Sequence, residues 1–372
     1  MSKSALPALS ALLLAAFSAN ATAAGLQYWQ QNASGLGVAY AGSAAVGDNA
    51  STVYFNPAAM TMLPGIQVSL GAVGAWPSYQ FANAGIGLDG GDAGLSQGTG
   101  NGYATWQAMP EFFVGLGISQ PFGLGSDYDA NWAGAPQAIR SEIRTVNYNP
   151  SLAYRVSDKV SLGIGANYLT LDTEMTRTGL NYSGSDGAWG WNTGALFTLS
   201  PAMRVGVSYR SAVSLSPDGG SGIKLPDTAI LSVWQQVSDR WEAMGDLSYT
   251  HWNTVKSLGA PGESIDFDNA WRVAWGAAYR ASDAWKLKFG IAYDRSPTRS
   301  TSTRIARMPD NDNLWLSLGA QWNAGRYGRI DAGYSYIYVR DSNIDSTGNG
   351  IRVQGSYDIN SHVLGAQYSI GF

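Results

Sequence analysis

Apolar and polar residues alternate strictly along most of the chain. In residues 160–168, Val160, Leu162 and Ile164 fall on one side of an extended backbone, and serine, glycine and asparagine fall on the other. The same period, with tryptophan or tyrosine on the apolar side, recurs in residues 271–280, 314–322 and 363–372. A two-residue period predicts β-strands that each have one apolar face.

The connections between these strands distinguish two folds. In a soluble sandwich the apolar faces form the core, whereas in an outer-membrane barrel they contact lipid. Short turns recur at residues 157–159, 200–202, 238–240, 282–284 and 324–326. Long polar stretches lie near residues 172–187, 212–228, 256–269, 295–312 and 341–361. Because transmembrane barrels place short turns on one side and long loops on the other, this order favours an all-β, transmembrane antiparallel β-barrel.

The strand count depends on the first third of the chain. Long loops are expected near residues 82–101 and 122–140, and Pro110 predicts a turn at residues 109–111 because proline cannot donate to a central ladder. Seven long loops and six short turns predict fourteen strands. The stretch at 102–122 is short for the strands assigned to it, so twelve strands remain an alternative.

Composition agrees with a membrane barrel and excludes other classes. Only 13% of the 372 residues are charged, against about a quarter in an ordinary soluble domain. The chain has 46 glycines, 14 tryptophans and 20 tyrosines but no cysteine, which excludes disulfides and thiolate metal sites. A formal net charge of −4 offers no basic face for nucleic acid. The low charge suits lipid-facing walls, and the aromatic excess suits two interfacial girdles.

The N-terminus predicts export. Lys3 precedes an apolar run from Ala5 to Phe17, and small residues at Ala21 and Ala23 form a cleavage site. We therefore expect a signal peptide at residues 1–24, with cleavage within one residue of that point, and a mature protein in the bacterial outer membrane.

Residues 25–65 do not alternate like the rest. Small residues dominate this segment, and Pro57 pushes Asn56 away from helical geometry, which ends a local element. Small side chains suit short helices packed inside a narrow lumen. We expect a plug at residues 25–65 and the barrel at residues 66–372.

This segment resembles the N-terminal hatch of the FadL family of outer-membrane long-chain fatty-acid transporters. The resemblance rests on residues 33–37 and 51–58, where Asn56-Pro57-Ala58 matches the family's Asn-Pro-Ala motif. It extends over the mature chain through residues 120–124, 149–154, 225–227, 272–280, 308–312 and the terminal Phe372. The chain departs from the family in its short 102–122 stretch.

The resemblance implies a path for a hydrophobic substrate. Substrate is captured among the extracellular loops, enters an apolar pocket in the barrel, and leaves sideways at a kink in the third strand. Phe55, Asn56, Pro57 and Ala58 are expected to lie along this path, against a kink at Pro121, Phe122 and Gly123. Glycine marks a bend within a strand, and proline removes a ladder donor. The alternative is an ordinary strand end before a loop.

Further residues are candidates for ligand contact. Trp132 and Ile139 belong to an unusually apolar external loop, which is either a capture groove or a loop packed on the barrel rim. A carboxylate substrate requires a cation, and the candidates on or near predicted inward faces are Arg144, Arg204, Arg210 and Arg272. The alternative for each arginine is a charge network in the lumen.

These observations predict passive, ligand-gated uptake of long-chain fatty acids, with aromatic hydrocarbons as the alternative substrate. A lipid enzyme is disfavoured because neither His251 nor His362 has a serine partner in sequence, and the plug disfavours an open porin. No cofactor or metal is expected, and residues 310–313 are interpreted as a solvated turn. Expected partners are outer-membrane lipid and lipopolysaccharide, and the assembly machinery through Phe372. We expect a monomer that binds no nucleic acid.

Overall fold

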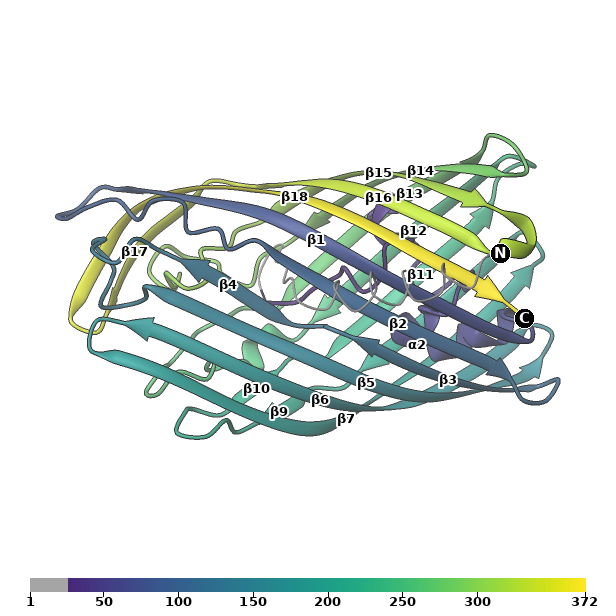
Figure 1. The fold of residues 1–372 in the computed structure, drawn as a ribbon, viewed down its shortest axis with the longest axis horizontal. Helices are drawn as coiled ribbons and strands as arrows, with labels where there is room; N and C mark the ends of the chain where they lie inside the picture. Colours follow the sequence, from purple (N-terminus) through teal and green to yellow (C-terminus); the bar gives the residue numbers. More distant parts are fainter. Residues whose placement is uncertain (1–25) are drawn as a thin grey trace, which may run out of the picture.

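A computed structural model describes residues 26–372, so the predicted signal peptide lies outside the described residues. The chain forms a closed antiparallel barrel of fourteen strands (Figure 1), which confirms the predicted count. The barrel strands are β1 (Ile66–Asn83), β2 (Gln97–Gln107), β3 (Phe112–Ser119), β5 (Arg140–Ser157), β6 (Val160–Arg177), β7 (Leu180–Ser200), β8 (Met203–Arg210), β11 (Thr228–Gln236), β12 (Trp241–Thr250), β13 (Ala270–Arg280), β14 (Trp285–Asp294), β15 (Asn313–Asn323), β16 (Arg329–Val339) and β18 (Ile351–Gly371).

The first and last strands close the barrel. β1 pairs with β18 from Gln67 opposite Gly371 to Asn83 opposite Gly355. Four short strands supplement the ring: β4 (Gly123–Asp127) pairs with β5, β9 (Val213–Leu215) pairs with β10 (Ile223–Leu225), and β17 (Ser342–Gly348) pairs with β18. Among the described residues, no helix has the length and apolar character needed to cross a membrane.

The apolar face of each strand points outward. Ile164 and Trp275 are 57% and 59% exposed, whereas Ser161 and Arg272 on the opposite faces are buried. This arrangement inverts a soluble protein: the apolar face meets the hydrocarbon of the membrane, and the polar face lines the lumen.

Two predicted loops are wrong. β6 and β7 run through residues 172–187 and are joined by a tight turn at Thr178-Gly179, and β17 and β18 occupy most of residues 341–361. These strand ends are polar on both faces because they extend beyond the membrane, where each face meets water. Alternation is lost there, although the backbone pairing continues.

Residues 26–65, hereafter the N-terminal segment, lie inside the barrel (Figure 1). The segment contains the 3-10 helices η2 (Leu36–Val38) and η3 (Pro57–Met62) and the single helical turn α2 (Thr52–Phe55). Small residues let its backbone approach the wall closely, and most of its side chains are buried.

Inward-facing glycines form the surface on which the N-terminal segment rests. A Cβ added to Gly290 would lie 2.2 Å from the Val38 carbonyl carbon, and one added to Gly206 would lie 2.0 Å from the Ala44 oxygen. We call this set of glycines the seat, one from each of nine strands: Gly115, Gly163, Gly194, Gly206, Gly276, Gly290, Gly319, Gly333 and Gly365. Glycine is required because an added Cβ would collide with the backbone or side chains of the N-terminal segment.

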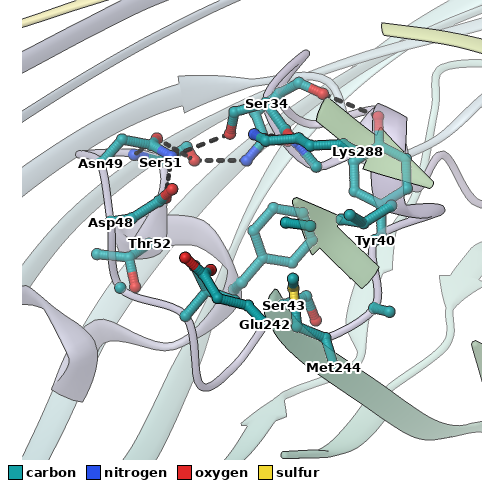
Figure 2. Close-up of a pocket in the computed structure, with 18 of the residues that line it drawn as sticks. Ser34, Tyr40, Ser43, Asp48, Asn49, Ser51, Thr52, Glu242, Met244 and Lys288 are labelled. Atoms are coloured by element: carbon teal, nitrogen blue, oxygen red, sulfur yellow. Dashed lines mark hydrogen bonds between the residues drawn. The ribbon is translucent and has the colours of Figure 1, made fainter. Parts of the chain in front are cut away.

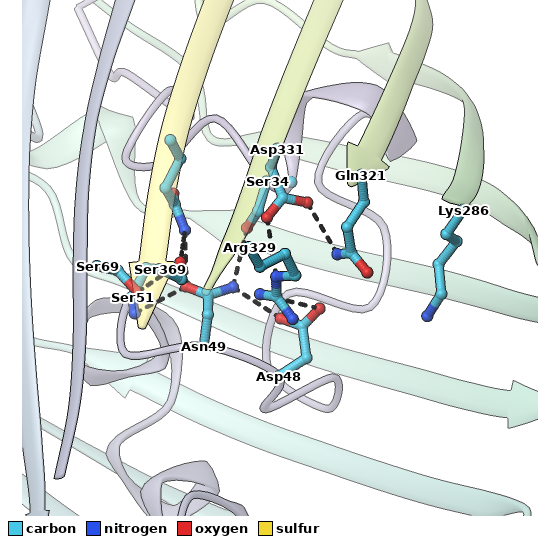
Figure 3. Close-up of polar contacts among 12 residues, drawn as sticks. Ser34, Asp48, Asn49, Ser51, Ser69, Lys286, Gln321, Arg329, Asp331 and Ser369 are labelled. Atoms are coloured by element: carbon cyan, nitrogen blue, oxygen red, sulfur yellow. Dashed lines mark hydrogen bonds and ion pairs between the residues drawn. The ribbon is translucent and has the colours of Figure 1, made fainter. Parts of the chain in front are cut away.

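Buried ion pairs lie beside the seat. The Lys288 ammonium lies 2.7 Å from the Asp331 carboxylate and donates to the Ser34 carbonyl at 2.8 Å. Arg329 bridges Asp331 to Asp48 of the N-terminal segment (Figure 3). Burial alone would raise the pKa of Asp48, but the cations Arg329 and Lys288 hold it well below its usual range. The segment is therefore fixed by charge as well as by shape.

Candidate functional site

The third barrel strand is interrupted. β3 ends at Ser119 and β4 begins at Gly123, and both pair with β5. β2 pairs with β3 only through residues 102–107, and β4 lies off that path. We call this break in pairing, between residues 97–101 of β2 and residues 120–123, the wall gap. It falls where Pro121 and Gly123 predict a kink.

Residues from before β1 fill one side of the wall gap. The Tyr28 N–H donates to the Pro121 carbonyl at 2.8 Å, and the Gly123 N–H donates to the Leu26 carbonyl at 2.9 Å. Gln27 forms an antiparallel bridge with Phe122. Leu26–Tyr28 therefore takes the place beside β4 that β2 holds beside β3.

Side chains connect this stretch to the other side of the wall gap. We call Leu26–Gln31 the gate stretch. The Tyr28 hydroxyl donates to Gln97 Oε1 on β2 at 2.5 Å, and the Tyr103 hydroxyl donates to the Gln31 carbonyl at 2.7 Å. The barrel wall is thus completed here by a segment that is not a barrel strand.

Gly123 is required by the position of Tyr28. A Cβ at residue 123 would lie 2.2 Å from the Tyr28 hydroxyl oxygen and 2.4 Å from the ring carbon that carries it. The ring therefore packs directly on the backbone of β4. Any side chain at residue 123 would compete with Tyr28 for the same space.

An aromatic pocket lies in the lumen beside the gate stretch. Its lining includes Trp29, Tyr54, Phe55, Phe122 and Arg210. The cavity holds about 30 Å³, which is room for only a few water molecules. A hydrocarbon chain can therefore enter only when part of the lining moves, and the gate stretch forms one side of it.

Arg210, at the end of β8, gives this pocket a positive charge. It donates to the Tyr54 carbonyl at 2.8 Å, contacts Asn167, and lies over the Tyr54 ring with 4.2 Å to the centroid. Within residues 26–372, no carboxylate forms an ion pair with Arg210. A buried cation of this kind is suited to an anionic group from a ligand.

Two other candidate arginines are committed to different contacts. Arg272 is 3% exposed and its guanidinium lies 2.6 Å from the Asp294 carboxylate. The guanidinium of Arg204 lies over the Trp234 ring, 4.0 Å from its centroid. Neither residue lines the aromatic pocket.

Arg144 faces outward, and the expectation of an inward position is wrong. Its side chain is 52% exposed and pairs with Glu142 at 2.5 Å, while the neighbouring Thr145 is buried. Successive residues of a strand face opposite sides. Since Thr145 faces the lumen, Arg144 points away from the pocket.

Asn56, Pro57 and Ala58 lie against a different part of the wall from the kink. Asn56 donates to the Ala195 carbonyl of β7 at 3.0 Å, and its Oδ1 accepts from the Ala58 N–H at 3.0 Å, which caps η3. A Cβ on Gly163 of β6 would lie 2.3 Å from the Ala58 nitrogen. Pro121, Phe122 and Gly123 are bonded instead to the gate stretch, through the two backbone hydrogen bonds and the bridge described above.

The loop that carries Trp132 packs on the barrel rim. Trp132 is 2% exposed, stacks on Tyr128 with 4.0 Å between ring centroids, and meets Phe81 edge-on. Ile139 is partly buried against the same cluster. This arrangement matches the rim-packing alternative, and a role in ligand capture remains a prediction.

A second cavity, of about 60 Å³, lies between the N-terminal segment and strands β12–β14 (Figure 2). Its lining includes the charged residues Asp48, Glu242 and Lys288 together with Tyr40 and Met244. Charged groups strongly prefer water to hydrocarbon. This cavity therefore suits water, in contrast to the aromatic pocket.

Residues 310–313 do not form a solvated turn. Asp310 and Asp312 are 7% and 8% exposed, and they accept hydrogen bonds from Ser296 and Tyr293. The interpretation from sequence failed because nothing in the local pattern indicates that residues 295–312 fold over the barrel mouth. Among the described residues, no group of three or more potential ligands could hold a metal.

Both histidines lie near the outer surface. His251 Nδ1 is 2.5 Å from Asp227, which also accepts from the Tyr209 hydroxyl, and His362 Nδ1 is 2.8 Å from the Tyr334 hydroxyl. In the described part of the chain, these bonds give neither histidine a serine partner.

Reasoning from sequence missed the gate stretch. Its one signal is the aromatic pair Tyr28-Trp29 at the start of a segment otherwise dominated by small residues. Both rings lie at the wall gap and the aromatic pocket.

Comparison with known proteins places the chain among transport proteins. A family profile described as "Outer membrane protein transport protein (OMPP1/FadL/TodX)" matches residues 14–222 and 214–372. An outer membrane protein P1 of Haemophilus influenzae is 31% identical, over 88% of each chain. A long-chain fatty acid transport protein of Escherichia coli K12 is 26% identical, over 90% of this chain and 92% of its own length.

Solved structures share the fold. The crystal structure of a Pseudomonas aeruginosa FadL homologue superposes with a TM-score of 0.84 at 22% identity, over 94% of this chain and all of that one. The Pseudomonas putida toluene transporter TodX superposes with a TM-score of 0.71 at 13% identity, over 92% of this chain and 98% of its own.

Proposed function

Because the chain belongs to the OMPP1/FadL/TodX family of outer-membrane transport proteins, we propose that it is a passive conduit for long-chain fatty acids. Substrate enters from the extracellular loops, occupies the aromatic pocket, and leaves through the wall gap when the gate stretch moves. The observation that carries this proposal is the wall gap itself. The gate stretch closes it in place of a barrel strand, and the gap borders the aromatic pocket. Among the described residues, no carboxylate forms an ion pair with Arg210 of that pocket.

The pocket supports a carboxylate-bearing substrate. Trp29, Phe55 and Phe122 offer apolar contact for a hydrocarbon tail, and Arg210 offers a charge for the head. Relatives in the family carry names that refer to fatty acids or to toluene. An aromatic hydrocarbon offers Arg210 only the face of its ring, a weaker contact than a carboxylate, so the pocket favours the fatty acid.

The gate stretch supports gating by ligand. It is bonded to residues 121–123 by two backbone hydrogen bonds and a bridge, and to β2 through side chains. A tail that enters the pocket displaces Trp29 and the adjoining Tyr28, which releases the bonds that close the gap. The coupling between pocket and gap is direct because the same residues line both.

No energy source is needed for this route. The sugar layer of the outer leaflet repels hydrophobic solutes, and the barrel provides a sheltered path through it. Once a tail reaches lipid, it gains about 0.8 kcal/mol for each buried methylene. Because the exit faces lipid and the tail carries no charge, the substrate diffuses down this gradient of free energy into the membrane.

Substitution of Gly123 tests the proposal. In Gly123→Leu the new side chain takes the space that Tyr28 vacates on opening, so we expect fatty-acid uptake to fall at least about tenfold while the barrel still assembles. Uptake of labelled hexadecanoate by cells that lack their own transporter measures the first property, and heat-modifiable migration on gels measures the second.

Gly245→Leu is the matched control. A Cβ at Gly245 meets only the Ala274 oxygen, at 3.8 Å, so this variant adds the same bulk without blocking the gap. Normal uptake in Gly123→Leu, or equal loss in both variants, would reject the wall gap as the exit.

Arg210→Met tests the choice of substrate. Loss of a charge-assisted hydrogen bond costs about 1.5–3 kcal/mol, so hexadecanoate binding is expected to weaken about tenfold or more. Toluene uptake should stay unchanged. Equal loss for both ligands would assign Arg210 a structural role instead.

A further inference from the structure

The inner face of β2 carries an uncharged polar side chain at almost every position beside the wall gap. Gln97, Thr99 and Asn101 point into the lumen beside the wall gap, and Thr105 lies on the same face farther along, where β2 pairs with β3; each is at most 4% exposed. We call these four residues the polar ladder. Tyr103 lies between Asn101 and Thr105 on this face, and its hydroxyl donates to the Gln31 carbonyl of the gate stretch.

Most of the polar ladder lacks hydrogen-bond partners. In the described part of the chain, Gln97 Nε2, both amide atoms of Asn101 and Thr105 Oγ1 are buried and unbonded. Gln30, on the gate stretch, has both of its amide atoms in the same condition, and its residue is 2% exposed. Buried polar groups in proteins are nearly always bonded, so the unbonded atoms that β2 and the gate stretch both carry at the wall gap require an explanation.

The backbone of β2 adds further polar groups to the wall gap. Residues 97–101 pair with β1 on one side but have no strand on the other. Within residues 26–372, no backbone hydrogen bond joins them to the gate stretch. One edge of the gap is therefore an unpaired strand edge, which is costly beside lipid unless a polar group approaches it.

We infer that the polar ladder carries the hydrogen-bonding head of an amphiphile while its tail passes through the wall gap. This inference rests on the proposed function and narrows its substrate class to chains with a carboxylate or similar head. A pure hydrocarbon cannot bond to the ladder and leaves its polar groups unsatisfied. A carboxylate accepts from the free N–H and O–H groups of Gln97, Asn101, Thr105 and Gln30.

The ladder and Arg210 have complementary properties. Arg210 is charged and suits a head at rest in the pocket, whereas the ladder has no charge and its bonds to a carboxylate are weaker. A head can therefore move from rung to rung without being trapped. Gln97, Thr99 and Asn101 repeat every second residue along β2, so these rungs are about 7 Å apart, and Thr105 lies about twice that distance beyond Asn101 because Tyr103 intervenes.

Asn101→Leu and Thr105→Val test the inference, because each removes polar atoms and keeps the branching of the side chain. Thr173→Val is the matched control, since Thr173 on β6 is also buried with an unbonded hydroxyl but lies away from the wall gap. Initial uptake of hexadecanoate and of hexadecane, which differ in the head alone, is measured in cells that lack their own transporter.

The expected result is selective loss. Hexadecanoate uptake should fall about tenfold in Asn101→Leu and less in Thr105→Val, while hexadecane uptake stays constant or rises. Asn101→Ser, which restores a donor, should recover part of the loss, and Thr173→Val should match the wild type. Heat-modifiable migration confirms that each barrel is folded.

Two outcomes would overturn the inference: equal loss for both probes, or no loss for hexadecanoate. Failure of the proposed function is distinguishable from either. In that case the wild-type protein would take up hexadecanoate no faster than cells without it, or Gly123→Leu would have no effect.

Discussion

Residues 33–63 and the gate stretch both lie inside the barrel, but the contacts that hold them differ in kind. Residues 33–63 rest backbone to backbone on the seat and are fixed by buried ion pairs such as Lys288–Asp331. The gate stretch is bonded to one edge of the wall gap, and side chains alone join it to the other. One chain segment thus combines a part held by close packing and buried charge with a part that, under the proposed function, a ligand displaces.

Substitutions in the seat should have the largest effect. In Gly290→Leu the side chain collides with the Val38 backbone, which has little room to shift because Gly276 also contacts Val38 and Gly319 contacts the preceding Gly37. We expect the plug to leave its place and the barrel to conduct ions steadily in planar bilayers. Gly245→Leu serves as the control, and a closed Gly290→Leu barrel would contradict the rigid-plug interpretation.

Substitutions in the buried ion pairs should have the next largest effect. Asp331→Asn leaves the Lys288 ammonium buried without its counter-charge, which costs about 3 kcal/mol of unfolding free energy. Urea unfolding in vesicles measures this loss. Asp345→Asn breaks the exposed pair with Arg352 and should leave stability unchanged, since pairs in water contribute little. Equal losses of unfolding free energy in the two variants would show that the buried ion pairs do not fix residues 33–63 in the barrel.

The gate should respond more mildly. Tyr28→Phe removes the one hydrogen bond from its hydroxyl to Gln97, worth about 1 kcal/mol, and keeps the ring on Gly123. We expect faster hexadecanoate uptake, by a few fold, with no steady conductance. Steady conductance like that of Gly290→Leu would show that the gate stretch and residues 33–63 move as a single unit.

The loop at residues 295–312 should show the smallest effect, a dependence of its stability on pH. Burial raises the pKa of Asp310 to about 7, against the opposing effect of its bond from Ser296 and of Arg304. Because this pKa lies above that of an unfolded aspartate, the loop is most stable at low pH and loses stability as pH rises through about 7. Protease cleavage within residues 295–312 should be faster at about pH 8 than at about pH 5.5. Asp310→Asn should abolish the difference, and an unchanged difference would exclude Asp310.

The sequence predicted what depends on short-range periodicity. Alternation in stretches such as residues 160–168 located the lipid-facing walls, and turn residues fixed the fourteen strands. Pro121 and Gly123 marked the interrupted strand because their effects on a ladder are local. Beyond the membrane, alternation does not reveal the strands, because β6 and β7 continue through residues 172–187 with water on both faces.

Contacts between distant parts of the chain were beyond the sequence. Nothing in Leu26–Tyr28 signals pairing with residues almost a hundred positions later, and nothing in Asn56 indicates its bond to β7. Arg210 could not be separated from Arg272 until Asp294 was found beside the latter. The seat was hidden for the same reason, because each of its glycines looks like any other lumen glycine until the plug is in place.

The seam between β1 and β18 has a consequence for biogenesis. The N-terminal segment leads directly into β1, and its contacts reach glycines on nine strands, including Gly365 of β18. The strands that contact the segment make up most of the circumference of the barrel. We therefore expect the strands to assemble around the N-terminal segment before β18 meets β1.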